Sequence, residues 1–292
     1  MVTILYNTNI FGIVGSNNNL DYKQSDVIIW DDLNKKIIYK FFIKKKVLNL
    51  KFTHDKMIII CQYTIYIFNL ENFQLIDNIK TGSNPKGLIG INYSKNKLIL
   101  VYPSNEEGKG QLTIKHCYSR KYIYLNPHNN KVSYIGLSFD GLLLATASED
   151  GKKIRIFTTE TGEYLEELYR GKEKAEIKYI SFNHNNQFIA VSSGKGTIHI
   201  WSLAESIKKI KESMKFLGFE EKTNNISNDY GTFSITGKEW SFAQVRLNEP
   251  SIFHFSDEKT LIIITQNGKY YKAKIDLKKG GECHIIEQKE LF

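Results

Sequence analysis

The feature that most constrains the fold of this chain is the recurrence of short, β-rich segments along its length. Each segment alternates β-branched or aromatic residues with polar ones, which is the pattern of a strand with one buried face. The clearest examples are Val27–Asp31, Ile65–Asn69, Leu112–Lys115, Ile154–Phe157, Ile198–Trp201 and Tyr270–Ala273. The first five follow one another at intervals of roughly 40–45 residues, which is the length of one four-stranded blade of a β-propeller.

The stretches between these segments favour further strands joined by tight turns. Leu142–Ala147 and Phe188–Val191 are apolar runs, and each is followed by a turn rich in Gly and Ser. Repeated small sheets protect their strand edges by closing a ring. We therefore predict an all-β, WD40-like β-propeller that forms a single domain over residues 1–292, with about six blades. The expected blades cover residues 2–43, 46–81, 86–124, 131–168, 175–248 and 250–292.

The composition allows a large core and an anionic partner. Hydrophobic residues make up 41% of the chain, and the net charge is +9 at pH 7. A basic surplus suggests nucleic acid, a membrane surface or an acidic protein as partner. The lysines are dispersed, however, without the stripe of interleaved aromatic residues that marks a nucleic-acid interface, so we expect no nucleic-acid partner.

The sequence contains no motif for catalysis or for metal binding. It has no Gly-rich phosphate loop, no nucleophile elbow and no HExxH motif. The 3 cysteines, Cys61, Cys117 and Cys283, are too few and too scattered for a disulfide framework. His116 and Cys117 are adjacent, so on a strand they point to opposite faces rather than to one zinc ion. We therefore expect a protein that is not an enzyme and that needs no metal or cofactor.

One long insertion interrupts the repeat after Trp201 and extends over residues 204–237. The apolar residues of its first half recur at spacings of three and four, namely Ile207, Ile210, Met214 and Leu217. Its lysines lie mostly on the other side, namely Lys208, Lys209, Lys211 and Lys215. This pattern predicts a basic amphipathic helix over residues 204–219. Such a helix either lies in a membrane interface with its apolar face down or packs on the side of the propeller.

A tight turn that carries a cation lies between two of the predicted repeats, at Glu167–Gly171. The flanking segments are Ile154–Phe157 and Ile198–Trp201, and we expect both to be outer strands of their blades. The guanidinium group presents a rigid fork of donors that matches phosphate oxygens. Arg170 is therefore either an anion-binding group or a solvated charge on the rim.

Several short motifs follow one another in a fixed order along nearly the whole chain. They are Trp30–Asp32, Asn84–Leu88, Leu100–Pro103, Ala145–Ser148, Ile154–Phe157, Leu168–Gly171, Ser192–Ile200, Trp240–Ala243 and Gly280–Cys283. Each is weak alone, but in this order and spacing the chain resembles the PROPPINs, the phosphoinositide-binding β-propellers that include the autophagy WIPI proteins. The family is seven-bladed, and we find no counterpart to the blade that precedes the segment matching Val2–Gly15.

The resemblance implies a lipid-binding pocket at Arg170, which we call site 2. The family marks its two lipid pockets with Phe/Leu-Arg-Arg-Gly, and the corresponding residues here are Leu168, Tyr169, Arg170 and Gly171. By this resemblance site 2 consists of Arg170, Gly171, Ser192, Ser193, Lys195, Thr197 and His199. Hydroxyls, a cation and an imidazole around an arginine suit an inositol phosphate.

The resemblance implies a second, weakened pocket, which we call site 1. Its residues are Ser148, Lys152, Arg155 and Tyr169. Tyr169 replaces the first arginine of the family motif and supplies no fixed positive charge, and Lys152 stands where the family usually has Thr. Lys152 or Lys153 is the candidate to compensate. We therefore expect one good lipid site and one poor one.

The function implied by the resemblance is that of a phosphoinositide-binding adaptor. The expected lipids are phosphatidylinositol 3-phosphate and 3,5-bisphosphate, and the expected partners are autophagy or lipid-transfer proteins. We expect a cytoplasmic monomer, peripherally bound to endosomal or autophagosomal membranes. The insertion falls where the family carries its membrane-inserting loop, which implies membrane contact for Ile207, Lys208, Ile210, Lys211, Met214, Phe216, Leu217 and Phe219. The alternative is a WD-repeat-type scaffold that binds only proteins.

Overall fold

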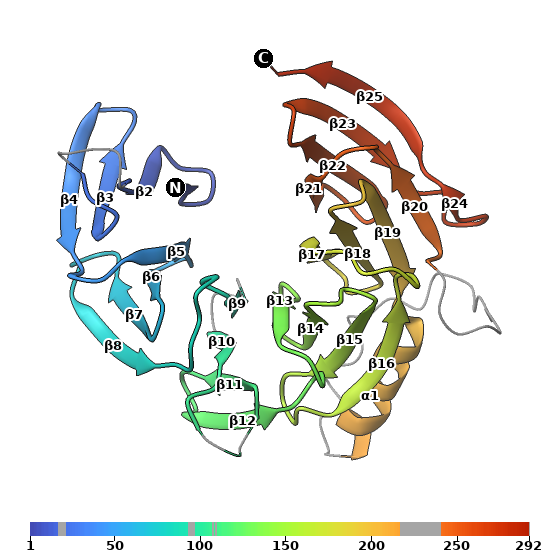
Figure 1. Ribbon diagram of the computed structural model, residues 1–292, viewed down its shortest axis with the longest axis horizontal. Helices are drawn as coiled ribbons and strands as arrows, with labels where there is room; N and C mark the ends of the chain where they lie inside the picture. The colour runs from blue at the N-terminus through green and yellow to red at the C-terminus, as the bar shows by residue number, and fades with distance from the viewer. Residues whose placement is uncertain (17–21, 93–96, 107, 109, 217–240, 292) are drawn as a thin grey trace. The chain divides into compact units, whose positions relative to one another are not determined.

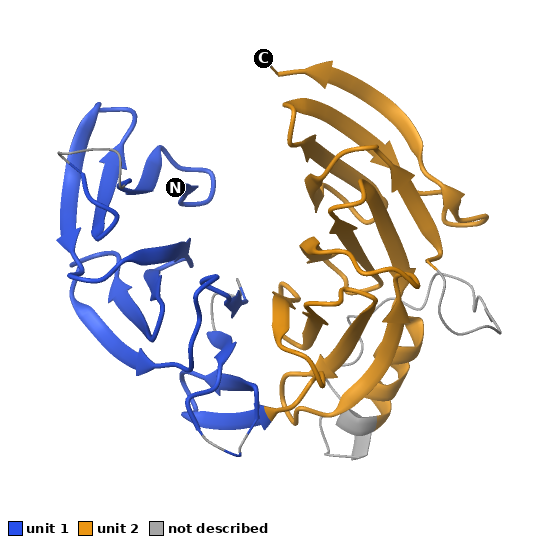
Figure 2. Cartoon of the chain, in the orientation of Figure 1, with its two compact units in different colours: residues 1–124 blue, residues 125–292 orange. Residues whose placement is uncertain are grey.

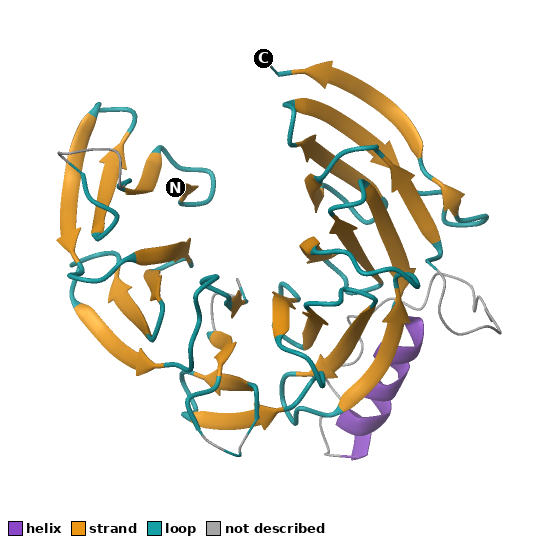
Figure 3. Cartoon of the chain, viewed as in Figure 1, coloured by secondary structure: helices purple, strands orange, loops and turns teal. Residues whose placement is uncertain are grey.

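The computed structural model describes residues 1–16, 22–92, 97–106, 108, 110–216 and 241–291. Within these residues the chain forms six small sheets and one helix (Figure 1, Figure 3). Five sheets have four strands and one has five, and four of the sheets are built entirely from successive strands of the chain. Each predicted blade range holds four strands of one sheet to within a residue, so the predicted repeat is confirmed. The last range also holds the two-residue strand β24 (Gly281–Glu282), which pairs with the fifth sheet.

The chain divides into two compact units, residues 1–124 and 125–292 (Figure 2). The single domain predicted over residues 1–292 stays a prediction of the sequence. The first unit holds three sheets. The first sheet contains β1 (Val2–Ile4), β2 (Ile10–Val14), β3 (Asp26–Asp31) and β4 (Lys36–Phe42). The second contains β5 (Val47–Phe52), β6 (Lys56–Cys61), β7 (Thr64–Asn69) and β8 (Leu75–Lys80). The third contains β9 (Gly90–Ile91), β10 (Ile99–Pro103), β11 (Leu112–His116) and β12 (Lys121–Leu125).

The second unit holds the other three sheets and the helix. The fourth sheet contains β13 (Val132–Leu137), β14 (Leu143–Ser148), β15 (Lys153–Thr158) and β16 (Tyr164–Tyr169). The fifth contains β17 (Ile177–Phe182), β18 (Phe188–Ser193), β19 (Thr197–Ser202), β20 (Ala243–Arg246) and β24 (Gly281–Glu282). The sixth contains β21 (Ser251–Phe255), β22 (Thr260–Thr265), β23 (Lys269–Lys274) and β25 (His284–Glu290). Helix α1 (Ala204–Phe216) follows β19.

The hydrophobic cores lie between successive sheets of each unit. In the first unit one cluster joins the first and second sheets and another joins the second and third. In the second unit the clusters join the fourth to the fifth sheet and the fifth to the sixth. Every residue of β14 and β18 is buried. These strands have neighbours on both faces, and they therefore appear in the sequence as continuous runs of apolar and small residues.

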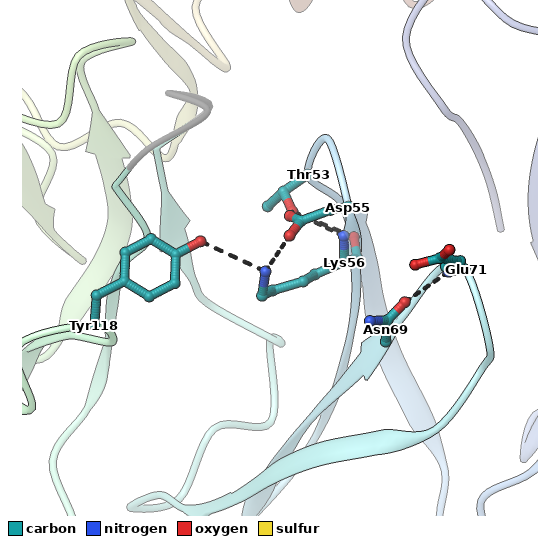
Figure 4. A network of polar contacts seen from close by, with 6 residues as sticks. All are labelled: Thr53, Asp55, Lys56, Asn69, Glu71 and Tyr118. Atoms are coloured by element: carbon teal, nitrogen blue, oxygen red, sulfur yellow. Dashed lines mark hydrogen bonds and ion pairs between the residues drawn. The ribbon is translucent and has the colours of Figure 1, made fainter.

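A polar contact in the first unit joins its second and third sheets (Figure 4). Lys56, at the start of β6, contacts the carboxylate of Asp55, and its ammonium lies 3.5 Å from the Tyr118 hydroxyl in the turn after β11. The ammonium is also 5.6 Å from the centre of the Tyr118 ring, within the range of a cation–π interaction. Because Asp55 and Tyr118 are exposed, we assign this contact a small stabilising effect and no part in a binding site.

Two strands that the sequence analysis places on the outside of their blades are third strands instead. Ile154–Phe157 lies in β15 and Ile198–Trp201 lies in β19, and each pairs with one further strand, β16 or β20. The true outer strand β16 carries half-buried Glu166 and Glu167, so its β pattern is weaker than that of β15. Because β16 ends at Tyr169, Arg170 is the first residue beyond the outer strand.

Candidate functional site

Site 2 forms where three turns of the second unit come together. The turns are residues 149–152, which join β14 to β15, residues 170–176, which join β16 to β17, and residues 194–196, which join β18 to β19. Backbone hydrogen bonds hold them together. The Arg170 N–H donates to the Lys152 carbonyl at 2.8 Å, and the Gly194 N–H donates to the Glu176 carbonyl at 2.9 Å. The fold therefore brings residues from two neighbouring sheets to one place.

Arg170 cross-links two of these turns through its guanidinium group. Its Nε donates to the Gly151 carbonyl at 2.5 Å, and its Nη2 donates to the Glu173 carbonyl. The residue is only 6% exposed. Arg170 is therefore a buried group that orders the site, and the alternative of a solvated rim charge is wrong.

Gly151 makes this arrangement possible because no larger residue fits its position. Its φ of +56° lies in the left-handed region that side chains with a Cβ rarely adopt. A Cβ atom there would lie 1.8 Å from the Ala175 carbonyl oxygen. The Gly151 carbonyl meets the Arg170 Nε because the two turns approach this closely.

The positive charge of Arg170 has no carboxylate partner among the described residues. Arg170 and Lys115 are the only buried Lys or Arg residues among those that the structure describes, and Lys115 is paired with Asp77 at 2.6 Å. The partners of Arg170 are neutral carbonyls, and its Nη1 donates to no described residue. Burial lowers the pKa of Arg170, although a guanidinium stays charged at neutral pH. Burying a cation costs free energy unless an anion compensates its charge, so the position of Arg170 is suited to binding an anion.

The hydroxyls predicted for site 2 are mostly enclosed. Ser192 is 1% exposed and donates to the Ser251 carbonyl of β21 at 2.7 Å. Ser193 is also 1% exposed, and its hydroxyl lies 3.5 Å from the backbone N of Lys195. These serines shape the turn that presents Lys195, and we assign them a supporting role rather than a direct contact with a ligand.

The accessible part of site 2 is formed by Lys195 and by the backbone at Gly171. The Lys195 side chain is 43% exposed and forms an ion pair with the Glu173 carboxylate. A Cβ atom built on Gly171 would meet nothing within 4 Å, so the chain there is open to a ligand. Glu173 does not appear among the site residues predicted from the sequence, because an acidic residue is not expected in an anion site.

His199 lies on β19 and is neutral at physiological pH. Its Nδ1 is 3.1 Å from the Ser241 hydroxyl. Burial lowers the pKa of His199 to about 4, and the charges of Arg170 and Arg246 contribute in the same direction. The positive charge of Arg170 therefore helps to keep the imidazole neutral.

Arg246 is a cation beside site 2 that the sequence analysis missed. It is the cross-strand partner of Thr197 on the neighbouring strand β20. Its guanidinium is exposed and lies 3.7 Å from the Glu282 carboxylate. The pairing of β19 with β20 spans the long insertion, so no local pattern in the sequence connects Arg246 with Thr197.

Site 1 contains a carboxylate of its own. Arg155 Nε donates to Glu167 at 2.8 Å across the β15–β16 ladder, and Lys153 Nζ contacts the other carboxylate oxygen at 2.5 Å. Arg155 Nη1 donates to the Pro127 carbonyl at 2.7 Å. Although burial raises the pKa of Glu167, Lys153 and Arg155 hold it below its ordinary value. Glu167 is therefore an internal partner of both Arg155 and the neighbouring Lys153.

Of the other predicted residues of site 1, Lys152 is the one that carries a positive charge. Ser148 is buried, and its carbonyl accepts a hydrogen bond from the Ser133 hydroxyl at 2.8 Å. Lys152 is half-buried, and its carbonyl accepts the Arg170 N–H. Tyr169 lies opposite Lys153 in the β15–β16 ladder, so Lys153 is close to the position of the missing arginine, but it is paired with Glu167.

His128, beside site 1, provides a prediction about stability. It is 7% exposed, and its Nε2 lies 3.0 Å from the Thr146 hydroxyl. Burial lowers its pKa from 6.5 to about 4, so between these values the unfolded chain binds a proton that the folded chain does not. The stability that neutral His128 allows is present above pH ~6.5 and is lost towards pH ~4, by up to about 3 kcal/mol.

Denaturant titrations of the wild type and of His128→Gln between pH 7 and pH 4 test this prediction. The variant is expected to lose less free energy of unfolding on acidification than the wild type. His184→Gln, at an exposed position, is the control and should follow the wild type. Identical pH dependence in all three proteins would contradict the assignment to His128.

Helix α1 packs against β16, the outer strand that leads into Arg170 (Figure 1). Ser206 donates to the Glu166 carboxylate, and Lys209 donates to the Leu165 carbonyl. Ile210 is 6% exposed and belongs to the core cluster of the fourth and fifth sheets. The half-buried carboxyl of Glu166 faces the helix, and its partial burial raises its pKa. The helix is therefore docked on the sheet through part of its apolar side.

This placement changes the interpretation of the predicted membrane-contact residues. Ile210 was expected to enter a bilayer, but it faces the protein core because packing against Leu165 and Trp201 already removes it from water. Ile207 and Lys211 are half-buried, whereas Lys208 is exposed. Met214 and Phe216 belong to the helix, but their side chains lie outside the described part of the structure, as do residues Leu217 and Phe219. Among the described residues no helix has the length and apolarity needed to span a membrane.

The docking of α1 predicts the effect of replacing Ile210. Ile210→Ala removes a buried side chain and leaves a cavity, so it is expected to lower the free energy of unfolding by about 2–4 kcal/mol. Chemical denaturation measures this change. Lys208→Ala, at an exposed position two residues earlier, should change stability by less than about 0.5 kcal/mol. An Ile210→Ala protein as stable as the wild type would mean that the helix is not docked in solution.

The comparisons with known proteins agree with the fold and identify the family. A protein-family model described as PROPPIN matches residues 13–292. Autophagy-related protein 18e of Arabidopsis thaliana is 30% identical over 297 residues, which covers 99% of this chain and 75% of that protein. WD repeat domain phosphoinositide-interacting protein 1 of Xenopus laevis is 26% identical over 264 residues, covering 84% of this chain and 59% of that protein.

Solved structures show the same fold at lower identity. The structure of Hsv2 from Kluyveromyces lactis with its complete loop 6CD has a TM-score of 0.77 and 21% identity, covering 100% of this chain and 86% of that one. The complex of KlAtg21 with the coiled coil of AgAtg16 gives a TM-score of 0.80 at 18% identity, covering 100% of this chain and 85% of that one. The all-β propeller fold predicted from the sequence is thereby confirmed. Because the family model covers nearly the whole chain, and a relative 30% identical to it spans the same length, this protein is a member of the PROPPIN family.

Proposed function

We propose that this protein binds phosphoinositides at site 2 and acts as a peripheral membrane adaptor. The observation that carries the proposal is the buried guanidinium of Arg170, which has only backbone carbonyls as partners among the described residues. A phosphate monoester carries a charge of about −1.5 to −2 near pH 7 and presents several acceptor oxygens. It would compensate the charge of Arg170 and accept a hydrogen bond from Nη1, as charge-assisted pairs of this kind favour.

The surroundings of Arg170 fit an inositol headgroup that carries more than one polar group. Lys195 and Arg246 are exposed cations near Thr197, and each has an exposed carboxylate partner, Glu173 or Glu282, that a phosphate or hydroxyl of the ligand would have to replace. His199 adds a neutral imidazole that can donate or accept a hydrogen bond. Site 1 is a poor second pocket under this proposal, because Tyr169 supplies no positive charge and Glu167 already pairs with Arg155 and Lys153.

Family membership supports the choice of lipid. The relative from Xenopus laevis is named as a phosphoinositide-interacting protein. We assign phosphatidylinositol 3-phosphate and phosphatidylinositol 3,5-bisphosphate as the ligands, through the match of this chain to the family motif at Leu168–Gly171. We keep membrane contact in this proposal for the residues of the insertion that do not face the sheet, and we exclude Ile210, which is buried in the core.

The proposed partners are proteins of autophagy. The solved complex of KlAtg21 with the coiled coil of AgAtg16 supports a coiled-coil segment as one kind of partner. An adaptor of this type would concentrate its partner on membranes that carry the lipid, because two simultaneous attachments raise the effective local concentration. We place the protein on endosomal or autophagosomal membranes under this proposal.

Vesicle flotation of the purified wild type tests the proposal. Three sets of phosphatidylcholine vesicles are compared, with phosphatidylinositol 3-phosphate, with phosphatidylinositol 3,5-bisphosphate, and with enough phosphatidylserine to match the negative charge. The protein should float with the first two sets and remain in solution with the third at physiological salt. Equal flotation with all three would show charge attraction alone and overturn the headgroup site.

Lys195→Ala provides a second test at a residue that does not support the fold. Because its side chain is 43% exposed, its removal should leave the melting temperature unchanged. Loss of one charge-assisted contact is expected to weaken binding of dioctanoyl phosphatidylinositol 3-phosphate by about three- to tenfold in a calorimetric titration. Lys178→Ala, on the neighbouring strand β17, serves as the control. An unchanged affinity in Lys195→Ala would remove Lys195 from the site.

The second candidate function is that of a scaffold that binds proteins only. The observation in its favour is site 1, where a carboxylate satisfies the cations that a lipid would otherwise bind. This function predicts no flotation with any of the three vesicle sets, together with retained binding of a coiled-coil partner. The same flotation experiment therefore distinguishes the two functions.

A further inference from the structure

Glu173 contacts both principal cations of site 2. Its backbone carbonyl accepts a hydrogen bond from Arg170 Nη2, and its carboxylate is paired with Lys195 Nζ. The first contact fixes the position of residue 173 beside the guanidinium. The second places a negative charge where the proposed ligand would bring its phosphate.

We propose that Glu173 is an internal competitor of the ligand, and that a phosphoinositide must displace its carboxylate from Lys195 in order to bind. This inference rests on the proposed function of site 2 and adds to it a step that limits affinity. In the structure Lys195 is satisfied by Glu173, so binding exchanges one ion pair for another. Arg170 makes no such exchange, because its partners are backbone carbonyls.

The exposure of the pair makes this exchange feasible. The Glu173 side chain is 77% exposed and the Lys195 side chain is 43% exposed, so the pair is open to water. Ion pairs of this kind contribute little to stability and are weakened by salt. The carboxylate can turn into solvent while its backbone carbonyl remains bound to Arg170, so the turn keeps its shape when the ligand arrives.

The ligand has an electrostatic advantage over the carboxylate in this competition. A carboxylate carries one negative charge, whereas a phosphate monoester carries about −1.5 to −2 near pH 7. The phosphate would also interact with Arg170, which the carboxylate of Glu173 does not contact in the described structure.

Removing the charge of Glu173 should therefore strengthen binding. Glu173→Gln keeps the size of the side chain and the backbone carbonyl, but it forms no ion pair with Lys195. We expect the variant to bind dioctanoyl phosphatidylinositol 3-phosphate about two- to fivefold more tightly than the wild type in calorimetric titrations at low salt. The gain should shrink as the salt concentration rises.

A matched control separates this effect from a general change in net charge. Glu176 lies on the same connection and is paired with Lys178 at 2.6 Å, with similarly exposed side chains. Glu176→Gln changes the net charge equally and should leave the affinity within twofold of the wild type. The double variant Glu173→Gln/Lys195→Ala should bind no more tightly than Lys195→Ala. Without the Lys195 ammonium, the Glu173 carboxylate and the ligand no longer compete for the same group.

The possible outcomes are distinct. A gain in Glu173→Gln that is absent from Glu176→Gln and is lost without Lys195 supports the inference. Equal affinities of Glu173→Gln and the wild type, or equal gains in the two glutamine variants, overturn the inference alone. Absence of binding by every protein in the series overturns the inference and the proposed function together.

Discussion

Replacing Arg170 with alanine is expected to weaken binding of dioctanoyl phosphatidylinositol 3-phosphate by about two orders of magnitude. The guanidinium is the buried cation of site 2, and it is held in place by the Gly151 and Glu173 carbonyls. A charge-assisted hydrogen bond contributes about 1.5–3 kcal/mol, and a positive charge in a partly desolvated position interacts more strongly than one in water. No other described residue of site 2 combines burial with an uncompensated positive charge.

The same substitution is expected to reduce stability, because Arg170 also cross-links two turns. Losing its hydrogen bonds to two carbonyls should cost about 1–3 kcal/mol of unfolding free energy. Calorimetric titration measures the affinity, and a thermal melt of the same sample measures the stability. Lys172→Ala, two residues away at an exposed position, is the control and should change neither. A folded Arg170→Ala protein that binds the lipid like the wild type would contradict the role of Arg170.

Arg170→Lys separates the charge from the shape of the guanidinium. Lysine keeps the positive charge, but it cannot donate to both carbonyls from a planar fork. We expect an affinity between those of the wild type and Arg170→Ala, with a loss of stability close to that of the alanine variant. An affinity as low as that of Arg170→Ala would show that the fork, rather than the charge alone, is required.

Replacing Gly151 with alanine is expected to cause the largest loss of stability of any single change at the site. The residue has a φ of +56°, and a Cβ atom would lie 1.8 Å from the Ala175 carbonyl oxygen. Strain in the left-handed region and forced separation of the two turns together should cost about 3–5 kcal/mol. The separation would also move the carbonyl that holds Arg170 Nε, so lipid binding should fall with stability.

Gly194→Ala is the matched control for this prediction. Gly194 lies in the third turn of the same site, but the nearest atom to its Cβ position is 3.9 Å away, and its φ is not positive. We expect its free energy of unfolding, measured by denaturant titration, to stay within about 0.5 kcal/mol of the wild type. Similar losses in the two variants would show that glycine matters at this edge for a reason other than the close approach at Gly151.

The sheet repeat was predictable because the physical signal behind it is local. A strand with one buried face alternates apolar and polar residues, and each blade repeats this pattern together with its turns. The ends of the predicted blades therefore match the six sheets closely. The identity of the outer strand was not predictable in this way. The β16 strand carries Glu166 and Glu167, which resemble surface residues until the ladder with β15 is known.

The sequence analysis named two cations of the candidate site, Arg170 and Lys195, but it missed Arg246 and the carboxylates that pair with the cations. Arg170 and Lys195 stand in motifs that the sequence presents directly. Glu167 faces Arg155 only because of the β15–β16 register, and Glu173 reaches Lys195 only because two turns from different sheets meet. Pairings of this kind depend on tertiary structure, so a reading of the chain one segment at a time does not reveal them.

The docking of α1 was left open by its sequence for a related reason. A basic amphipathic pattern has the same spacing whether its apolar face meets a bilayer or a protein surface. What decides between them is the partner on β16, where Glu166 and the Leu165 carbonyl receive hydrogen bonds from the helix. These groups lie about 40 residues earlier in the chain, at separations of 40 and 44.

The most direct measurement is a crystal structure of the protein grown with dioctanoyl phosphatidylinositol 3-phosphate. We predict that the 3-phosphate lies within hydrogen-bond distance of Arg170 Nη1, with Lys195 turned from Glu173 towards the same phosphate. A headgroup bound at another surface, with Arg170 and the Glu173–Lys195 pair unchanged, would contradict this prediction.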